Sequence, residues 1–376
     1  MNYNLQIYKL SNNDYTHMFI NTSHLVLTSP NENHSLFSLG YHHFIDRTRS
    51  ALVITDNIET KNSIYYVVNT FEPNISNYED NINNMAKIYF KNSVESREFY
   101  KFWEMYFIFD LLDTENIKAL CFNSCGEDQA IINYRNKFFE KTNKGDIIYK
   151  TYIPDIKADL LIVNNDKNNW NENENSYIKH LIDSVIKVIE SQKSKGNLII
   201  KINDTFTYPT IKLILLLSSM YEDSYIYKPY FSRPSDSEKF IICKNFSDKI
   251  DKKIVTNLKT ILKSTYKDDY ITDIFLDIVL PKSFLDIFKF TNIKFVNQQQ
   301  ILINNIIKYI RENNYFGDKY HKSVKQQQDA TAWWITQFFP PSDNIFKINK
   351  SMFKKLIETT TIKNNLEKDK FCSQLI

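Results

Sequence analysis

From about residue 91 to 250, short and almost wholly apolar segments alternate with longer segments whose apolar residues recur at helical spacing. A strand that is apolar along its length needs cover on both faces, so this pattern predicts an α/β fold with a mostly parallel sheet between helices. The last two strands leave no room for a helix and predict an antiparallel hairpin. The predicted strands are 118–124, 146–152, 159–163, 197–202, 224–228 and 239–244, and the predicted helices are 96–112, 128–140, 177–192 and 207–221.

The two flanks of this region have different patterns. Residues 1–90 contain short β-like segments at 25–28, 51–55 and 63–69, separated by turns rich in Asn, Ser and Asp. After residue 250 the chain is mostly helical in pattern, with helices expected at 252–266, 271–280, 282–290, 297–314 and 350–366. We therefore divide the chain into a β-rich region (1–90), an α/β domain (91–250) and a helical region (251–376).

An aromatic cluster lies within the helical region, just before two consecutive prolines. Docking of this region onto the α/β domain explains the cluster more simply than ligand stacking does. Its members are Trp333, Trp334, Phe338 and Phe339.

Glycine is scarce, with five residues where an average chain of 376 would have about 26. No two of them are close enough for a G-x-G-x-x-G dinucleotide fingerprint or a G-x-x-x-x-G-K-[ST] phosphate loop, which excludes both kinds of site. The five are Gly40, Gly126, Gly145, Gly196 and Gly317.

Charge is distributed unevenly along the chain. Lysine outnumbers arginine 41 to 6 and Asn, Ile and Tyr are frequent, a bias typical of AT-rich genomes such as those of large DNA viruses or parasites. The net charge is +3, but residues 251–376 carry 20 Lys/Arg against 13 Asp/Glu. A basic helical region suits a polyanion such as RNA, and a solvated lysine-rich surface explains it equally well.

The four cysteines are too few and too scattered for a disulfide framework or a four-cysteine zinc site, so we expect no metal. Cys121 lies in an apolar segment and is expected to be a buried thiol. The N-terminal sequence lacks the pattern of a signal peptide, and no apolar run is long enough to span a membrane. These features predict a soluble protein of the cytoplasm, which would be the host cytoplasm or the virion for a viral protein.

Charged residues occur where the predicted fold would bring them together. Lys201 ends an apolar strand, Glu238 opens the last strand, and Lys101 lies in the helix that enters the sheet. Ligand sites of open α/β sheets lie outside the carboxyl ends of the strands. A lysine held near other lysines and a carboxylate can act as a general base.

Three segments resemble the FtsJ-like RNA ribose 2′-O-methyltransferases. They are SREFYKFWE, GNLIIKINDTFT and YIYKPYFSRPSDSEKFIICKNF, and the resemblance covers about residues 91–250. It implies a Rossmann-like methyltransferase domain that uses S-adenosylmethionine and has a catalytic Lys-Asp-Lys-Glu tetrad. The lysines fall on Lys101 and Lys201 and the glutamate on Glu238. Lys201 would then take the proton from a ribose 2′-hydroxyl while Lys101 and Glu238 orient it.

The chain departs from the family pattern at two places. The tetrad aspartate falls on Asn164, at the end of the strand 159–163. Asp166, two residues further on, could substitute only if the loop is rearranged. In the turn after the first strand, where the family binds its cofactor, Gln129 and Ala130 replace an expected pair of glycines. The chain from Gly126 to Asn164 is also short and leaves little room for the strand that contacts the adenosine ribose in the family. The cofactor-binding residues expected from the resemblance are Asn123, Cys125, Gly126 and Asp128.

Three functions remain open at this point. The protein is an RNA cap or ribose 2′-O-methyltransferase, or an inactive methyltransferase-fold subunit of a transcription, capping or virion complex. The third alternative is an RNA-binding module that relies on residues 251–376.

Overall fold

The computed structural model describes residues 3–10, 15–20, 22, 26–30, 39–57, 68–72, 97–122, 126–139, 145–153, 155–164, 174–248, 250–265, 269–312 and 317–374. Its central element is a seven-stranded sheet in the order β1-β7-β8-β6-β5-β3-β4. The strands are β1 (Gln6–Lys9), β3 (Lys118–Phe122), β4 (Ile147–Tyr149), β5 (Ala158–Val163), β6 (Gln192–Ile202), β7 (Tyr221–Lys228) and β8 (Lys239–Phe246).

Strand directions agree with the predicted mixed sheet. β3 pairs in parallel with β4 and β5, and β5 pairs in parallel with β6. β8 runs antiparallel to both of its neighbours, β6 and β7, and so forms the expected hairpin with β7. β1 adds an antiparallel strand at the outer edge of β7, so a segment of the first ten residues completes the sheet.

Both faces of the sheet are buried, as the apolar strands require. In β5, Leu160 and Ile162 belong to one core cluster, while Leu161 and Val163 belong to the other. All four are at most 1% exposed. Because successive side chains of a strand point to opposite faces, only an apolar residue at every position can fill both layers.

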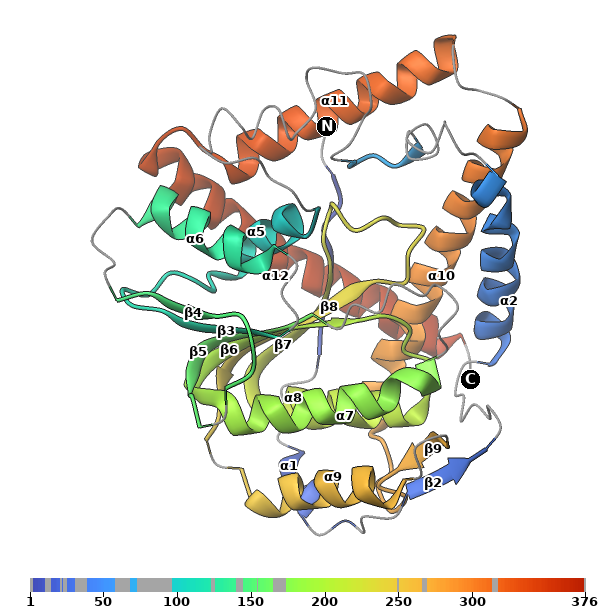
Figure 1. Ribbon diagram of the computed structural model, residues 1–376. Coiled ribbons are helices and arrows are strands. Elements are labelled where there is room, and N and C mark those ends of the chain that lie inside the picture. The colour runs from blue at the N-terminus through green and yellow to red at the C-terminus, as the bar shows by residue number, and fades with distance from the viewer. Residues whose placement is uncertain are drawn as a thin grey trace.

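Helices cover the sheet in two layers (Figure 1). α5, α6 and α11 lie over one face, and α7 and α8 lie over the other, with α9 further out. The helices are α1 (Thr16–Ile20), α2 (Leu39–Ser50), α5 (Arg97–Phe109), α6 (Glu127–Phe138), α7 (Glu174–Ser191), α8 (Tyr208–Ser219), α9 (Lys252–Ser264), α10 (Lys282–Arg311), α11 (Asp318–Phe338) and α12 (Asp343–Ser373).

The N-terminal region is less regular than the sequence predicts. The strand expected at 25–28 is found as β2 (Val26–Ser29). The strand expected at 51–55 is wrong, because Ala51–Asn57 forms a 3-10 helix that continues directly from α2. Most of the strand expected at 63–69 lies outside the described residues.

The helical region also required corrections. The helix expected at 271–280 is wrong, because β9 (Tyr270–Ile274) pairs with β2 in a separate two-stranded sheet. The helices expected at 282–290 and 297–314 are one continuous helix, α10, since no Gly or Pro interrupts residues 282–311. No helix was predicted where α11 lies. None of the described helices combines the length and apolarity that crossing a membrane requires.

The aromatic cluster docks the helical region onto the α/β domain, as predicted. Phe339 stacks on Trp103 of α5 with ring centroids 4.3 Å apart. Trp334 is fully buried and contacts Tyr100 and Phe231 edge to face. The helix that carries the first expected lysine is therefore held between the sheet and the C-terminal helices.

Gly196 occupies a position in β6 that has no room for a side chain. A Cβ there would lie 2.8 Å from the carbonyl oxygen of Lys193 and 2.9 Å from that of Asp159. Both distances are shorter than real Cβ atoms tolerate, so a glycine lets β6 approach β5 closely ahead of Lys201 in the same strand.

Candidate active site

Three segments that are distant in sequence meet at one end of the sheet. Lys101 lies in α5, Lys201 is the penultimate residue of β6, and Glu238 directly precedes β8. In the β6–β8 register, Lys201 is opposite Phe240 and Ile202 is opposite Lys239. This register brings Glu238 to the end of β6, next to Lys201.

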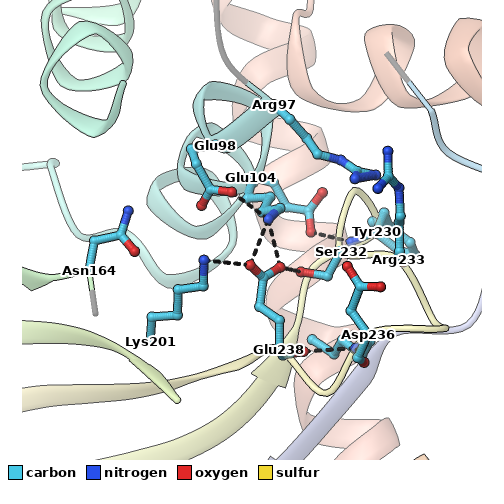
Figure 2. Close-up of polar contacts among 12 residues, drawn as sticks. Arg97, Glu98, Glu104, Asn164, Lys201, Tyr230, Ser232, Arg233, Asp236 and Glu238 are labelled. Atoms are coloured by element: carbon cyan, nitrogen blue, oxygen red, sulfur yellow. Dashed lines mark hydrogen bonds and ion pairs between the residues drawn. The ribbon is translucent and has the colours of Figure 1, made fainter. Parts of the chain in front are cut away.

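The side chains of these residues converge on the carboxylate of Glu238 (Figure 2). Lys101 Nζ lies 2.6 Å from Glu238 Oε1, and Lys201 Nζ lies 2.8 Å from Glu238 Oε2. Lys101 also donates to Glu98 Oε1 at 2.5 Å, and Ser232 Oγ donates to Glu238 Oε1 at 2.6 Å. We call Glu98, Lys101, Lys201, Ser232 and Glu238 the lysine–glutamate cluster.

The lysine–glutamate cluster is buried, so its charges interact strongly. The side chains of Lys101, Lys201 and Glu238 are 5%, 8% and 10% exposed. Burial alone would raise the pKa of Glu238, but the charges of Lys101 and Lys201 and their hydrogen bonds lower that pKa well below its ordinary value. Glu238 is therefore an anion shared by two lysines at neutral pH.

Asn164, at the tetrad aspartate position, has a different environment. It directly follows β5 and lies across from Lys201 in Figure 2, outside the hydrogen-bonded cluster. Its Nδ2 donates to Glu127 Oε1 at 2.6 Å. Within the described part of the chain, its buried Oδ1 has no hydrogen-bond partner.

The turn between β3 and α6 forms the wall next to Asn164. Gly126 has a positive φ of 115° and caps α6, whose first two residues are Glu127 and Asp128. Asp128 pairs with the exposed Lys150 at 2.7 Å. We call Gly126, Glu127, Asp128 and Asn164 the cofactor turn. Two of the expected cofactor residues, Asn123 and Cys125, lie outside the described residues.

The chain between β3 and β5 is short, as the sequence predicts. It contains α6 and one described strand, β4, which forms the edge of the sheet. Cys121 of β3 is a buried free thiol, as expected, and burial raises its pKa above the ordinary range. Among the described residues, no group of His, Cys, Asp or Glu side chains could hold a metal ion.

Two more buried lysines hold the loop that leads into Glu238. Lys228 Nζ donates to the carbonyl oxygens of Asp236 and Glu238, at 2.6 and 2.8 Å. Lys239 Nζ donates to the carbonyl oxygen of Asn203. Burial lowers the pKa of Lys228 to about 7 and that of Lys239 to about 8. The backbone on both sides of Glu238 is therefore anchored by these side chains.

Sequence reasoning missed the carboxylates that surround the cluster. Glu72, 3% exposed, accepts hydrogen bonds from Arg97 of α5 and Arg233 of the β7–β8 loop, at 2.9–3.1 Å. Two of only six arginines lie in the segments that resemble the family, and this concentration could have predicted a carboxylate partner near them. Arginine suits a planar, two-oxygen partner better than lysine does.

A second missed carboxylate, Glu104, lies one turn after Lys101 on α5. It accepts hydrogen bonds from Tyr227 Oη at 2.6 Å, Tyr230 N at 2.7 Å and Trp334 Nε1 at 2.9 Å. Burial raises the pKa of Glu104 to about 7 despite these donors. Glu104 thus links α5 to the β7–β8 loop and to α11.

The sheet order and the position of the buried charged groups define the class of this domain. Helices lie on both faces, and the site lies at the carboxyl ends of β5 and β6, where open α/β sheets bind ligands. The fold is that of a Rossmann-like methyltransferase. Residues 112–246 match the model of the FtsJ-like methyltransferase family, which is the family that the three sequence segments resemble.

Two relatives have similar sequences. An uncharacterized protein of Acanthamoeba polyphaga mimivirus is 25% identical over 246 residues, which cover 65% of this chain and 66% of the relative. The cap-specific mRNA (nucleoside-2′-O-)-methyltransferase 1 of Dictyostelium discoideum is 41% identical over 66 residues, which cover 18% of this chain and 9% of that enzyme. The chain thus spans less than two thirds of either relative.

The residues of the cofactor turn fit the cationic methyl donor that such a domain would use. S-adenosylmethionine carries a positively charged sulfonium and an ammonium group. Asn164 Oδ1 is a buried acceptor with no partner among the described residues, and the carboxylate of Glu127 lies on the other side of the same amide. A hydrogen-bond acceptor and a negative charge are the groups that a cation requires.

Proposed function

We propose that the protein is an S-adenosylmethionine-dependent RNA ribose 2′-O-methyltransferase. The observation that supports this proposal most directly is the sharing of the Glu238 carboxylate by Lys101 and Lys201 in a buried site. Lys101 also pairs with Glu98, so two lysines and two carboxylates share one buried site, and buried charged groups held by specific partners mark candidate functional sites. An arrangement of this kind suits proton transfer at a ribose hydroxyl.

Each member of the cluster has a distinct part in the proposed mechanism. Lys201 Nζ accepts the proton of the ribose 2′-hydroxyl, and Glu238 stabilises the ammonium that results. Lys101, held by Glu98 and Glu238, gives the hydroxyl a fixed donor and so orients it. When bound, S-adenosylmethionine supplies an electrophilic methyl group, and the new O–C bond forms as the C–S bond breaks.

The proposed substrate is capped mRNA, because the Dictyostelium relative is a cap-specific mRNA methyltransferase. The excess of basic residues after residue 250 would favour a polyanionic partner. The similarity to a mimivirus protein supports a viral context, with the protein in the host cytoplasm or the virion.

Cofactor binding and methyl transfer test the proposal together. We expect calorimetric binding of S-adenosylmethionine and transfer of a labelled methyl group to a capped oligonucleotide. The Lys201→Ala variant should lower the rate by about 10²–10⁴. Lys193→Ala is the matched control, because Lys193 lies on the same strand in an exposed pair with Asp159 and should change the rate little. Wild-type protein that neither binds the cofactor nor transfers methyl groups would rule out the proposed enzyme.

The second candidate function is that of an inactive methyltransferase-fold subunit within a capping, transcription or virion complex. The observation that favours it is the neutral side chain of Asn164 at the tetrad aspartate position. An inactive subunit would bind capped RNA or a protein partner without binding S-adenosylmethionine, so the calorimetric measurement separates the two functions.

A further inference from the structure

The side-chain amide of Asn164 has only one of its two polar atoms in a hydrogen bond. Asn164 is fully buried, and its Nδ2 donates to Glu127 Oε1 at 2.6 Å. In the described part of the structure, Oδ1 has no partner. A buried oxygen without a donor is costly, and such atoms are uncommon in folded proteins. This oxygen is therefore a buried acceptor that the described part of the fold does not use.

The carboxylate of Glu127 determines which way the amide points. A carboxylate oxygen can only accept, so the nitrogen of Asn164 must face Glu127. The amide oxygen must then point away, and in Figure 2 it lies on the side of Lys201. A flipped amide would bring its oxygen against a carboxylate oxygen and would be repelled. Asn164 therefore presents an acceptor where an aspartate would present one, but without the negative charge.

A carboxylate, that of Glu127, is hydrogen-bonded to Asn164. Glu127 is the first residue of α6 and is fully buried. The partial positive charge of a helix N-terminus stabilises a carboxylate at this position. The positive φ of Gly126 turns the chain so that α6 starts at Glu127. Where the family pattern has a carboxylate after the strand, this chain has an amide there and a carboxylate at the start of α6.

We propose that Glu127 and Asn164 together replace the aspartate that the tetrad lacks. Asn164 supplies the acceptor oxygen, and Glu127 is a positioning residue that fixes this oxygen and supplies the negative charge for a cationic methyl donor. The inference rests on the proposed function, since it assigns these residues to the methyl donor of that reaction.

A charge-exchange experiment tests this assignment. Glu127→Gln removes the charge and keeps the shape. Asn164→Asp restores the family residue but places two carboxylates together. The double variant Glu127→Gln/Asn164→Asp moves the charge to residue 164. Asp183→Asn is the control, because it makes a carboxylate-to-amide change in an exposed pair with Lys187 on α7, outside the site. Calorimetry measures the binding of S-adenosylmethionine and of S-adenosylhomocysteine, whose sulfur is neutral.

The expected pattern is loss in each single variant and rescue in the double variant. We expect Glu127→Gln to weaken S-adenosylmethionine binding about 10- to 100-fold. The loss should be smaller for S-adenosylhomocysteine. Asn164→Asp alone should also weaken binding, and the double variant should return to within about threefold of wild type. A residue that only supports the fold would produce no rescue and no difference between the two ligands.

The outcomes separate this inference from the function on which it rests. Wild-type protein that binds no S-adenosylmethionine would overturn both. Wild-type binding with unchanged affinity in Glu127→Gln would overturn the inference alone, as would a double variant no better than the single variants. Thermal unfolding of each variant without ligand identifies any loss that comes from misfolding.

Discussion

The lysine–glutamate cluster and the cofactor turn lie side by side but are built differently. In the cluster, two lysines share Glu238, and the surrounding distances are 2.5–2.8 Å. In the cofactor turn, a neutral amide and a carboxylate are joined by one hydrogen bond of 2.6 Å. Removing one member of a buried ionic cluster leaves the others uncompensated, so single substitutions there are severe. Glu127 and Asn164 are joined by a single hydrogen bond, so a carboxylate and an amide can be exchanged between the two positions by two substitutions.

The largest effect on stability is expected from Glu238→Ala, which removes the anion shared by two buried lysines. The free energy of unfolding should fall by about 3–5 kcal/mol, measured by urea denaturation. Lys193→Ala, in an exposed pair, should cost less than about 1 kcal/mol. A cost for Glu238→Ala as small as that of the control would mean that the cluster is not more tightly coupled than the surface.

The same carboxylate gives the cluster a pH dependence with a definite sign. The pKa of Glu238 is lowered on folding, so its contribution to stability is present above the ordinary glutamate pKa. It is lost as the pH falls from that value through the lowered pKa. Urea titrations of wild type and Glu238→Ala should therefore converge at acid pH, and parallel curves would contradict this account.

A smaller effect is expected from Glu104→Gln, which tests the support beneath the cluster. Tyr227 and Trp334 each donate to a different carboxylate oxygen of Glu104, and glutamine replaces one of these oxygens with a donating nitrogen, so one buried donor loses its partner. We expect a cost of about 1–3 kcal/mol. Trp334 fluorescence reports the loss directly, and an unchanged spectrum and stability would show that Glu104 does not hold α11 in place.

Glu104 also predicts a pH profile opposite in sign to that of Glu238. Its pKa is raised to about 7, so the stability from its protonated form is complete below the ordinary glutamate pKa. That stability is lost as the pH rises to about 7. Glu104→Gln should remove this slope, which urea titrations between about pH 5 and 8 would measure. A slope that persists in the variant must come from other groups.

Gly126→Ala tests whether the backbone of the cofactor turn is needed. The φ of 115° is unfavourable for alanine, and the expected cost is about 1–2 kcal/mol. We expect thermal denaturation to report this loss, with weaker S-adenosylmethionine binding in calorimetry. If the variant is as stable as wild type, the turn tolerates another conformation and the contrast with the cluster is sharper.

The smallest effect is expected from Asp128→Asn at the edge of the cofactor turn. The partner of Asp128 is Lys150, whose side chain is 69% exposed, so solvent screens this pair. Its loss should cost less than about 1 kcal/mol in urea denaturation. A larger cost would assign Asp128 a role beyond the pair with Lys150.

The sequence predicts best what depends on local pattern. β5, the apolar second half of β6, the buried α5 and the β7–β8 hairpin were predicted from the local pattern of their apolar residues. Lys101, Lys201 and Glu238 were brought together by a resemblance, and the structure places their side chains in contact. Their catalytic roles remain predictions.

The misses depend on distant partners. β9 carries a pattern that fits a helix, but it pairs with β2, more than 240 residues away in sequence. Glu72 contacts Arg97 and Arg233 only because the chain folds back over the site. The role proposed for Glu127 depends on its hydrogen bond to Asn164, which is 37 residues further along the chain. Such pairings are long-range properties that periodicity does not contain.

The contact between Trp334 and Glu104 has a consequence for how this domain could be transplanted. A fragment that ended near residue 250 would lose the indole that caps a carboxylate one turn from Lys101, and it would uncover Tyr100 and Trp103. A fragment that began near residue 91 would lose β1 from the edge of β7. The α/β domain therefore cannot be excised intact at residues 91 and 250, and a minimal expressed form must retain β1 and α11.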